Sequence, residues 1–201
     1  DGLPPQLAHI YQPKAKPISA RGFTEPLMEQ AMRTVLGKSE TDPVSAQELA
    51  SVEGLYVFGN TPSVNQDDFY TCANAWDSSG NRAKSNIASL EDVKLLPNLR
   101  FLCLAAQQIT DISPLASLLL LEKVELKHNR IADISVLASL PHLACVGPNG
   151  NPVSNTAPLG ECANLRLLNL CDVKEHDPAF LHELGDFEFP DLANDTNSFA
   201  H

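Results

Sequence analysis

Apolar residues recur along the chain at intervals of 22 positions. One column of branched aliphatic residues runs through Ile87, Ile109, Ile131 and Val153. A second column runs through Leu99, Leu121, Leu143 and Leu165, a third through Leu102, Val124, Val146 and Leu168, and a fourth through Leu104, Leu126, Pro148 and Leu170. A fixed period of this length is typical of repeat architectures, in which similar units stack side by side.

Each unit divides into a strand and a helical return. Residues 121–129, LEKVELKHN, alternate apolar and polar side chains, which predicts a short strand with one buried face. Residues 111–118, DISPLASL, open with Asp and Ser, which favour the start of a helical turn, and carry a proline where a first turn tolerates it. A polar column follows the strands at Gln107, Asn129 and Asn151. Its side chains can bond backbone groups where each strand turns away. Because one unit cannot bury its own apolar face, the units must stack.

The segments LRFLCLAAQQITDISPLASL (99–118) and LEKVELKHNRIADISVLASL (121–140) resemble the leucine-rich repeats of the 22-residue, internalin-like bacterial class. The resemblance covers roughly residues 87–192. It implies an α/β fold, a leucine-rich-repeat solenoid with parallel strands on a concave face, short helical or 3-10 returns, and a helical N-terminal cap.

The segment before the repeats matches such a cap. Residues 23–52 contain an apolar helical stripe with Thr24 as the expected N-cap and Gly37 as the expected stop. SAQE (45–48) is a capping box that predicts a second helix. GLYVFGN (54–60) then fits the strand columns as the first strand.

The repeat phase breaks after this first strand. The column of branched aliphatic residues should resume two positions after Asn60, yet its first member is Ile87, which predicts an insertion at 61–86. We therefore divide the chain into an extended, proline-containing tether at 1–22, the helical cap at 23–52, and a solenoid at 53–201. A degenerate C-terminal cap is expected from about residue 175.

Composition and charge narrow the possible partners. The chain has 201 residues and a formal net charge of −11, from 14 basic and 25 acidic side chains. Such a surface repels nucleic acid and anionic lipid, so we expect neither as a partner, and no segment is apolar enough to insert into a membrane. The five cysteines form no CxxC pair, and we predict no metal site and no cofactor.

The candidate binding residues lie at strand positions outside the repeat columns, which are expected to face outward from the concave wall. They are Tyr56, Phe58, Phe101, Lys123, Glu125, Lys127, Asn149, Leu167 and Asn169. An apolar patch among mixed charges is typical of a protein-binding surface, so the predicted partner is a protein ligand. The insertion adds Phe69, Tyr70 and Trp76, which either contact that partner or anchor the insertion to its own scaffold.

No nucleophile with a base, phosphate loop or other catalytic motif is present, so we predict no enzymatic activity. The predicted function is a non-enzymatic protein-recognition module. The resemblance implies an extracellular or cell-surface-attached location rather than a cytoplasmic one, with a signal or anchor outside this chain. Two alternatives stay open: an extracytoplasmic sensory or regulatory segment of a larger membrane protein such as a receptor-type kinase, and an intracellular repeat protein similar to phosphatase regulators.

Overall fold

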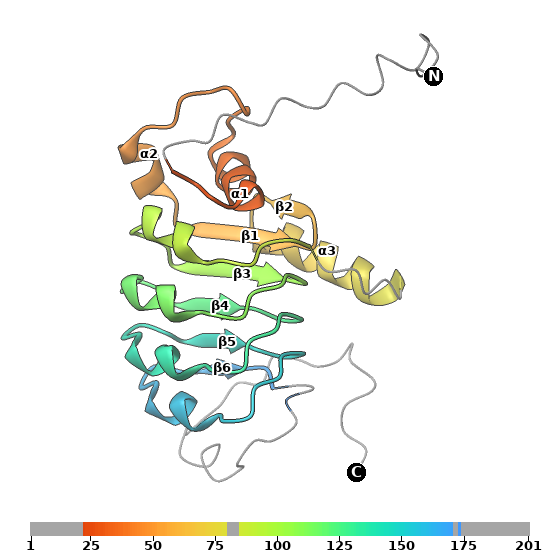
Figure 1. Cartoon of the computed structure of the whole chain (residues 1–201), viewed down its shortest axis with the longest axis vertical. Coiled ribbons are helices and arrows are strands. Elements are labelled where there is room, and N and C mark those ends of the chain that lie inside the picture. Colours follow the sequence, from red (N-terminus) through yellow and green to blue (C-terminus); the bar gives the residue numbers. More distant parts are fainter. Residues whose placement is uncertain (1–21, 80–84, 171–172, 174–201) are drawn as a thin grey trace, which may run out of the picture.

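A six-stranded sheet runs the length of the molecule in a computed structural model that describes residues 22–79, 85–170 and 173 (Figure 1). Its strands are β1 (Gly54–Phe58), β2 (Thr61–Ser63), β3 (Phe101–Ala105), β4 (Lys123–Glu125), β5 (Cys145–Gly147) and β6 (Leu167–Leu168). The order in the sheet is β2-β1-β3-β4-β5-β6. Only β2 is antiparallel to its neighbour, so the predicted stack of parallel strands is confirmed.

The register of the sheet follows the 22-residue period. Phe101 pairs with Lys123, Lys123 with Cys145, and Cys145 with Leu167. Gly54 in β1 pairs with Phe101, which lies more than two repeat lengths further along the chain. The extra segment includes β2 and the helix α3 (Gln66–Ser79), which lie between β1 and β3 in the sequence.

The returns between strands are single 3-10 turns. They span η1 (Glu91–Leu95), η2 (Ser113–Ser117), η3 (Ser135–Ser139) and η4 (Ala157–Glu161). Asp111 Oδ1 accepts a hydrogen bond from Ser113 N at 2.8 Å, and Asp133 Oδ1 accepts one from Ser135 N at the same distance. The short polar side chain before each turn thus fixes its first residues, as Asp and Asn do in turns generally.

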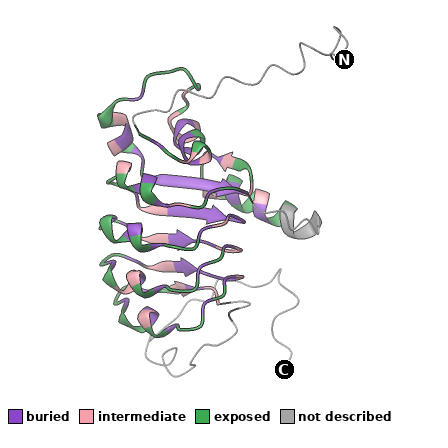
Figure 2. Ribbon diagram, in the orientation of Figure 1, coloured by how far each residue is buried: buried purple, intermediate pink, exposed green. Residues whose placement is uncertain are grey.

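The core lies between the sheet and the 3-10 turns, and each repeat adds one layer to it (Figure 2). The leucine and isoleucine columns identified in the sequence supply this layer; Leu104, Ile109 and Leu121 are fully buried. Because each layer packs on the next, no unit has a core of its own.

A ladder of buried amides joins each repeat to the one before it. Asn129 Oδ1 accepts a hydrogen bond from Ile109 N at 3.2 Å, and its Nδ2 donates to Leu104 O and Leu126 O, each at 2.8 Å. Asn151 repeats this pattern one unit later. The ladder satisfies backbone groups that the sheet leaves unpaired at the strand ends.

Two helices precede the first strand: α1 (Pro26–Leu36) packs on β1 and β2, and α2 (Ala46–Ser51) leads into β1. Met28 and Met32 of α1 are fully buried in the core. Gly37 ends α1 in the left-handed conformation with φ 64°, and Ser45 and Glu48 form the expected capping box of α2. The predicted helical cap is therefore confirmed.

The expected N-cap role of Thr24 is wrong. Glu25 occupies that position without a side-chain cap, and the acceptor comes from the first repeat instead. The carboxylate of Asp92 accepts hydrogen bonds from Glu25 N at 2.7 Å and from the backbone N and Oγ1 of Thr24. Glu25 Oε1 in turn accepts from Ala88 N and Ser89 N. The two carboxylates, one from each side of the joint, fasten the cap to the solenoid.

We expect Asp92→Ala to lower the free energy of unfolding by roughly 2–4 kcal/mol, because it leaves three donors without their buried acceptor. Equilibrium urea unfolding monitored by circular dichroism measures the change. The matched control is Asp111→Ala, which removes an exposed carboxylate from a single turn and should cost about 1 kcal/mol or less. Equal losses in the two variants would contradict the fastening role of Asp92.

Several expectations fall outside the described residues. These are the tether up to residue 21, residues 80–84 of the insertion, and the C-terminal cap from about residue 175. Among the helices that the structure does describe, none has the length and apolar character needed to cross a membrane.

Candidate functional site

The helix α3 packs on the outward face of β1 and β3. Phe69 and Ala73, four residues apart on one face of α3, are buried against Tyr56, Phe58 and the small side chains of β3. The rings of Phe58 and Phe69 lie with their centroids 5.6 Å apart. The sequence left open whether the aromatic residues of the insertion contact a partner or anchor the insertion. Phe69 anchors it, because its ring holds α3 against the sheet.

Burial by α3 corrects the expectation that Tyr56 and Phe58 lie on an open wall. Their exposed fractions are 7% and 3%. The physical cause is the insertion itself, which returns across the strand that precedes it and covers apolar side chains that would otherwise face water. Neither side chain is available to a partner in this conformation.

The side of α3 that faces away from β1 borders the outward face of β4. Tyr70 is 38% exposed and stands edge-on to Phe69, with ring centroids 5.3 Å apart. Lys123 of β4 places its Nζ 4.9 Å from the centre of the Tyr70 ring and donates to Gln66 Oε1 at 2.7 Å. Gln66, which the sequence analysis did not single out, thus ties α3 to the wall. The side chain of Trp76 lies outside the described residues.

Beyond α3, the wall is half-buried rather than fully open. Phe101 lies at its edge, with the guanidinium of Arg100 5.4 Å above the ring. Arg100 is itself held by Glu122, with Nη2 2.7 Å from Oε1. The remaining half-buried wall residues are Lys127, Cys145, Leu167 and Asn169. Together with Phe101, Tyr70, Lys123, Glu125 and Asn149, they form what we call the open wall.

Glu125 lies at the centre of the open wall with an exposed fraction of only 8%. Burial raises the pKa of its carboxyl to about 7, although Lys127 and Lys123 and a hydrogen bond from the Lys127 backbone act in the opposite direction. The side chain lies over Gly147 of β5, where a Cβ atom would come within 2.3 Å of Oε2. Only glycine leaves room for the carboxylate there.

The raised pKa of Glu125 predicts a loss of stability as the pH rises. Between about 4.5 and about 7 the unfolded chain has released the proton that the folded chain still holds, so the free energy of unfolding falls across this window. At pH 8 the loss is complete and amounts to roughly 3 kcal/mol. We expect Glu125→Gln to match the parent at low pH and to exceed it by about that amount at pH 8.

Urea unfolding at pH 4.5, 6 and 8 tests this expectation. Glu161→Gln, the same substitution at an exposed position on η4, should keep the pH dependence of the parent. The groups that face Glu125 are Lys123 and Lys127 of the β4 repeat, Tyr70 of α3, Cys103 of β3 and Cys145 of β5. An identical pH dependence in parent and Glu125→Gln would show that Glu125 is ionised throughout this range.

The thiols beside Glu125 are poorly suited to nucleophilic chemistry. Burial raises the pKa of Cys145 to about 11 and raises that of Cys103 further, so both are neutral near pH 7, whereas the thiolate is the reactive form. All four cysteines in the described part of the chain are free. In the same part, no three His, Cys, Asp or Glu side chains gather closely enough to hold a metal ion.

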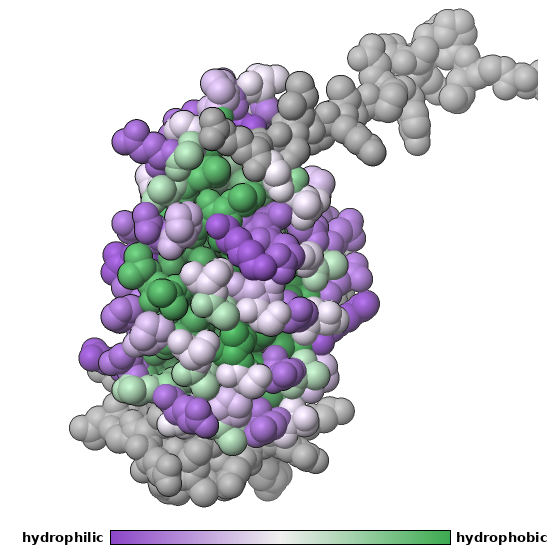
Figure 3. Space-filling view, turned by 60° about the vertical axis from the view of Figure 1, so that its left-hand side comes forward, coloured by the Kyte–Doolittle hydropathy of each residue, from purple (hydrophilic) through white to green (hydrophobic). Residues whose placement is uncertain are grey.

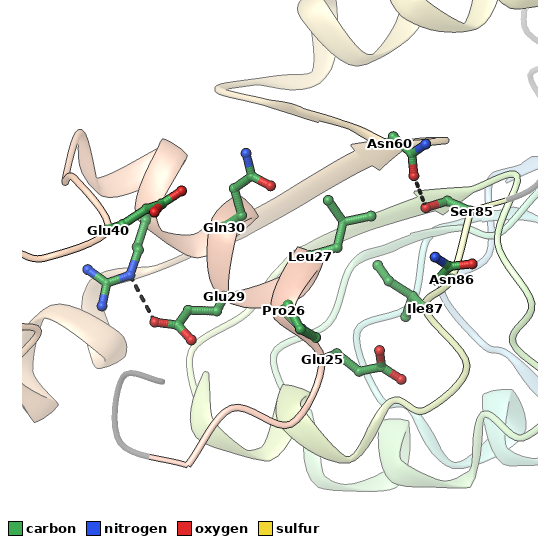
Figure 4. Close-up of a pocket in the computed structure, with 11 residues that line it drawn as sticks. Glu25, Pro26, Leu27, Glu29, Gln30, Glu40, Asn60, Ser85, Asn86 and Ile87 are labelled. Carbon is green, nitrogen blue, oxygen red and sulfur yellow. Dashed lines mark hydrogen bonds and ion pairs between the residues drawn. The ribbon is translucent and has the colours of Figure 1, made fainter. Parts of the chain in front are cut away.

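A cavity of about 340 Å³ lies away from the wall, between α1 and the loop that leads into the first repeat (Figure 4). Most of its polar lining side chains make contacts within the protein. Arg33 pairs with Glu29 at 3.0 Å, Ser85 donates to Asn60, and Glu25 accepts from the backbone of the first repeat. These contacts hold the cap in place and leave few groups directed at a ligand.

A second exposed apolar feature lies where η2 leads into β4. Leu119 and Leu120 are 58% and 43% exposed, whereas the matching positions of the next repeat are Pro141 and His142. On the side of the molecule shown in Figure 3, apolar patches are surrounded and interrupted by hydrophilic residues. The departure from the repeat pattern is visible in the sequence, but a pair of leucines alone does not define a binding site.

The similarity of this chain to known proteins lies in its structure. No protein-family model and no curated protein matches the sequence. Among solved structures, an internalin (InlF) of Listeria monocytogenes is 30% identical, with 80% of this chain and 40% of that chain covered and a TM-score of 0.60. Internalin C2 of the same species is 24% identical, with 84% and 93% covered and a TM-score of 0.49. A leucine-rich-repeat protein of Leptospira interrogans is 18% identical, with 74% and 33% covered and a TM-score of 0.53.

Stacked 22-residue units of strand, amide ladder and 3-10 turn define a leucine-rich-repeat solenoid, the class shared with these structures. Solenoids of this class typically present the strand face as an extended protein-binding surface. The helical N-terminal cap and the 30% identity to InlF narrow this class: the chain is an internalin-like leucine-rich-repeat protein. It spans 40% of the length of the InlF chain.

Proposed function

We propose that this protein is a non-enzymatic recognition module that binds a protein ligand on the open wall. The observation that supports the proposal most strongly is the division of the wall by α3. The helix covers the apolar side chains of β1 and β3, while β4 to β6 keep half-buried aliphatic, amide and charged groups in one continuous register.

This composition fits a protein partner. Tyr70, Phe101 and Leu167 provide apolar contact area, and Lys123, Lys127 and Asn169 provide donors around it. Interfaces combine such an apolar centre with a polar rim. No group on the open wall has the geometry of a nucleophile with its base, so binding rather than turnover is the activity we assign.

We place the protein at the bacterial cell surface. The support is the likeness to an internalin of Listeria monocytogenes, over 80% of this chain and 40% of that one. Fractionation of cells, followed by protease treatment of intact cells, tests this location: surface protein is degraded and cytoplasmic protein is protected.

Two matched substitutions test the binding surface. Leu167→Glu changes the open wall, whereas Leu119→Glu makes the same change on the exposed turn before β4. The purified parent chain and both variants are used as baits against surface fractions, and each is first shown to be folded by a thermal melt. We expect the parent and Leu119→Glu to retain the same protein and Leu167→Glu to lose it by at least about tenfold.

A second variant of the open wall, Tyr70→Ala, provides an independent test in case Leu167→Glu does not fold. Tyr70 is exposed, and its removal leaves the buried Phe69 in place. Loss of the captured protein in Leu119→Glu but not in the wall variants would place the contact on the turn. Retention by every variant would contradict the open wall as the binding surface.

A further inference from the structure

Two buried acceptor atoms on the open wall have no donor. Glu125 Oε1 and Asn149 Oδ1 accept no hydrogen bond in the described structure, and their side chains are 8% and 9% exposed. Buried polar atoms in proteins almost always have a partner, because leaving one unpaired costs free energy. Two unpaired acceptors in neighbouring repeats therefore indicate a donor that is supplied from outside the chain.

The two acceptors lie around one glycine. The carboxylate of Glu125 reaches across from β4 and lies over Gly147, since a Cβ atom on this glycine would stand only 2.3 Å from Oε2. Leu126 N donates to Gly147 O and His128 N donates to Asn149 O, so the two repeats stay aligned past the end of β5. Asn149 occupies the position that Lys127 holds one repeat earlier, and the Lys127 ammonium lies near the outward-facing ring of Phe58, so this position belongs to the open wall as Glu125 does. The backbone of Gly147 thus lies directly beneath the carboxylate of Glu125.

The ammonium groups of the neighbouring lysines lie over aromatic rings. Lys123 Nζ is bound by Gln66 and lies over Tyr70 of α3, and Lys127 Nζ lies 5.4 Å from the ring centre of Phe58 in β1. Glu125, in contrast, is directed toward β5. The two ammonium groups therefore contact the rings of Tyr70 in α3 and Phe58 in β1, whereas the Glu125 carboxylate lies over Gly147.

We propose that Glu125 and Asn149, above Gly147, form a subsite that receives a basic side chain, a lysine ammonium or an arginine guanidinium, of the protein ligand. This inference rests on the proposed function and specifies the chemistry of its central contact. Both cations are pure donors, which matches the two unpaired acceptor atoms, Glu125 Oε1 and Asn149 Oδ1. A charged donor also compensates a buried carboxylate more fully than a neutral one does. The net charge of −11 attracts a basic partner over longer distances.

The test uses a defined probe, the capped peptide acetyl-Gly-Arg-Gly-amide, and its neutral isostere with citrulline in place of arginine. Binding to the full chain is followed through the backbone amide signals of Gly147 and Asn149 in nitrogen-15 NMR spectra. We expect a saturable shift with the arginine peptide and an affinity at least about tenfold lower for the citrulline peptide. We also expect arginine binding to strengthen at least about threefold from pH 5.5 to pH 8, as Glu125 ionises.

Two variants locate the contact. Glu125→Gln should lower the affinity for the arginine peptide at least about tenfold and abolish its pH dependence, whereas Glu161→Gln, with the same loss of charge on η4, should bind like the parent. Gly147→Ala keeps every charge but places a methyl group where the carboxylate lies, and should also weaken binding. Thermal melts confirm that each variant is folded before it is titrated.

Equal shifts with the arginine and citrulline peptides, or no saturable shift with arginine at all, would overturn the subsite. So would undiminished binding to Glu125→Gln. Since no natural partner takes part in this titration, its failure leaves the proposed function standing as long as Leu167→Glu still loses the captured protein. If arginine binds at Gly147 but no wall substitution releases a captured protein, the proposed function fails and the assignment of the cation to a protein ligand fails with it.

Discussion

Leu126→Asp is expected to unfold the solenoid in water at 25 °C. Leu126 is 3% exposed and lies in the middle layer of the core. An aspartate there must either bury an unpaired charge or take up a proton, and it also loses the apolar contacts of the leucine. The combined cost exceeds about 4–5 kcal/mol, a large part of the roughly 5–15 kcal/mol by which a domain is usually stable.

Urea unfolding monitored by circular dichroism and tryptophan fluorescence measures the effect of Leu126→Asp. The matched control is Leu119→Asp, in the same repeat but exposed, which should change the free energy of unfolding by no more than about 0.5 kcal/mol. A cooperative transition at the parental midpoint in Leu126→Asp would mean that Leu126 does not face the core and that the register of the repeats is different.

Asn129→Ala is the second substitution with a large expected effect. It removes the acceptor of Ile109 N and the donor to Leu104 O inside a buried joint, whereas Leu126 O keeps a second donor from Asn151. Two buried backbone groups that lose a partner, together with the space left by the amide, correspond to a loss of roughly 3–5 kcal/mol.

The measurement for Asn129→Ala is again urea unfolding, with Asn155→Ala as the control. Asn155 is exposed and accepts a single hydrogen bond from Ala157 N, so its replacement should cost about 1 kcal/mol. If the two alanine variants unfold at the same urea concentration, the buried amide ladder contributes no more than an ordinary turn contact.

The solenoid could be predicted from the sequence because its core is periodic. Leu104, Leu126 and the other column residues face the same side in every unit, so a constant repeat spacing reveals burial directly. Asn129 and Asn151 were predictable for the same reason, since a polar residue at a fixed place after each strand has a fixed backbone environment.

The candidate site could not be predicted in the same way, because it is formed by contacts that do not recur from repeat to repeat. Whether α3 would cover Tyr56 and Phe58 is decided by the fit of Phe69 against them, which no spacing in the sequence encodes. The orientation of Glu125 toward Gly147 is equally local, because a glycine at one strand position changes what its neighbour can reach. Asp92, and not Thr24, is the acceptor at the start of α1, although it lies one full cap and insertion further along the chain.

The amide ladder also makes the length of the molecule adjustable. Each asparagine of the ladder bonds the backbone 20 residues before it and again 25 residues before it, and this joint is the same between the β3 and β4 repeats as between the β4 and β5 repeats. A coding segment for one repeat could therefore be duplicated or lost in evolution, and the joints on either side would re-form with equivalent atoms. Each such event would lengthen or shorten the open wall by one strand spacing, about 4.8 Å, so that the length of this surface changes in discrete steps.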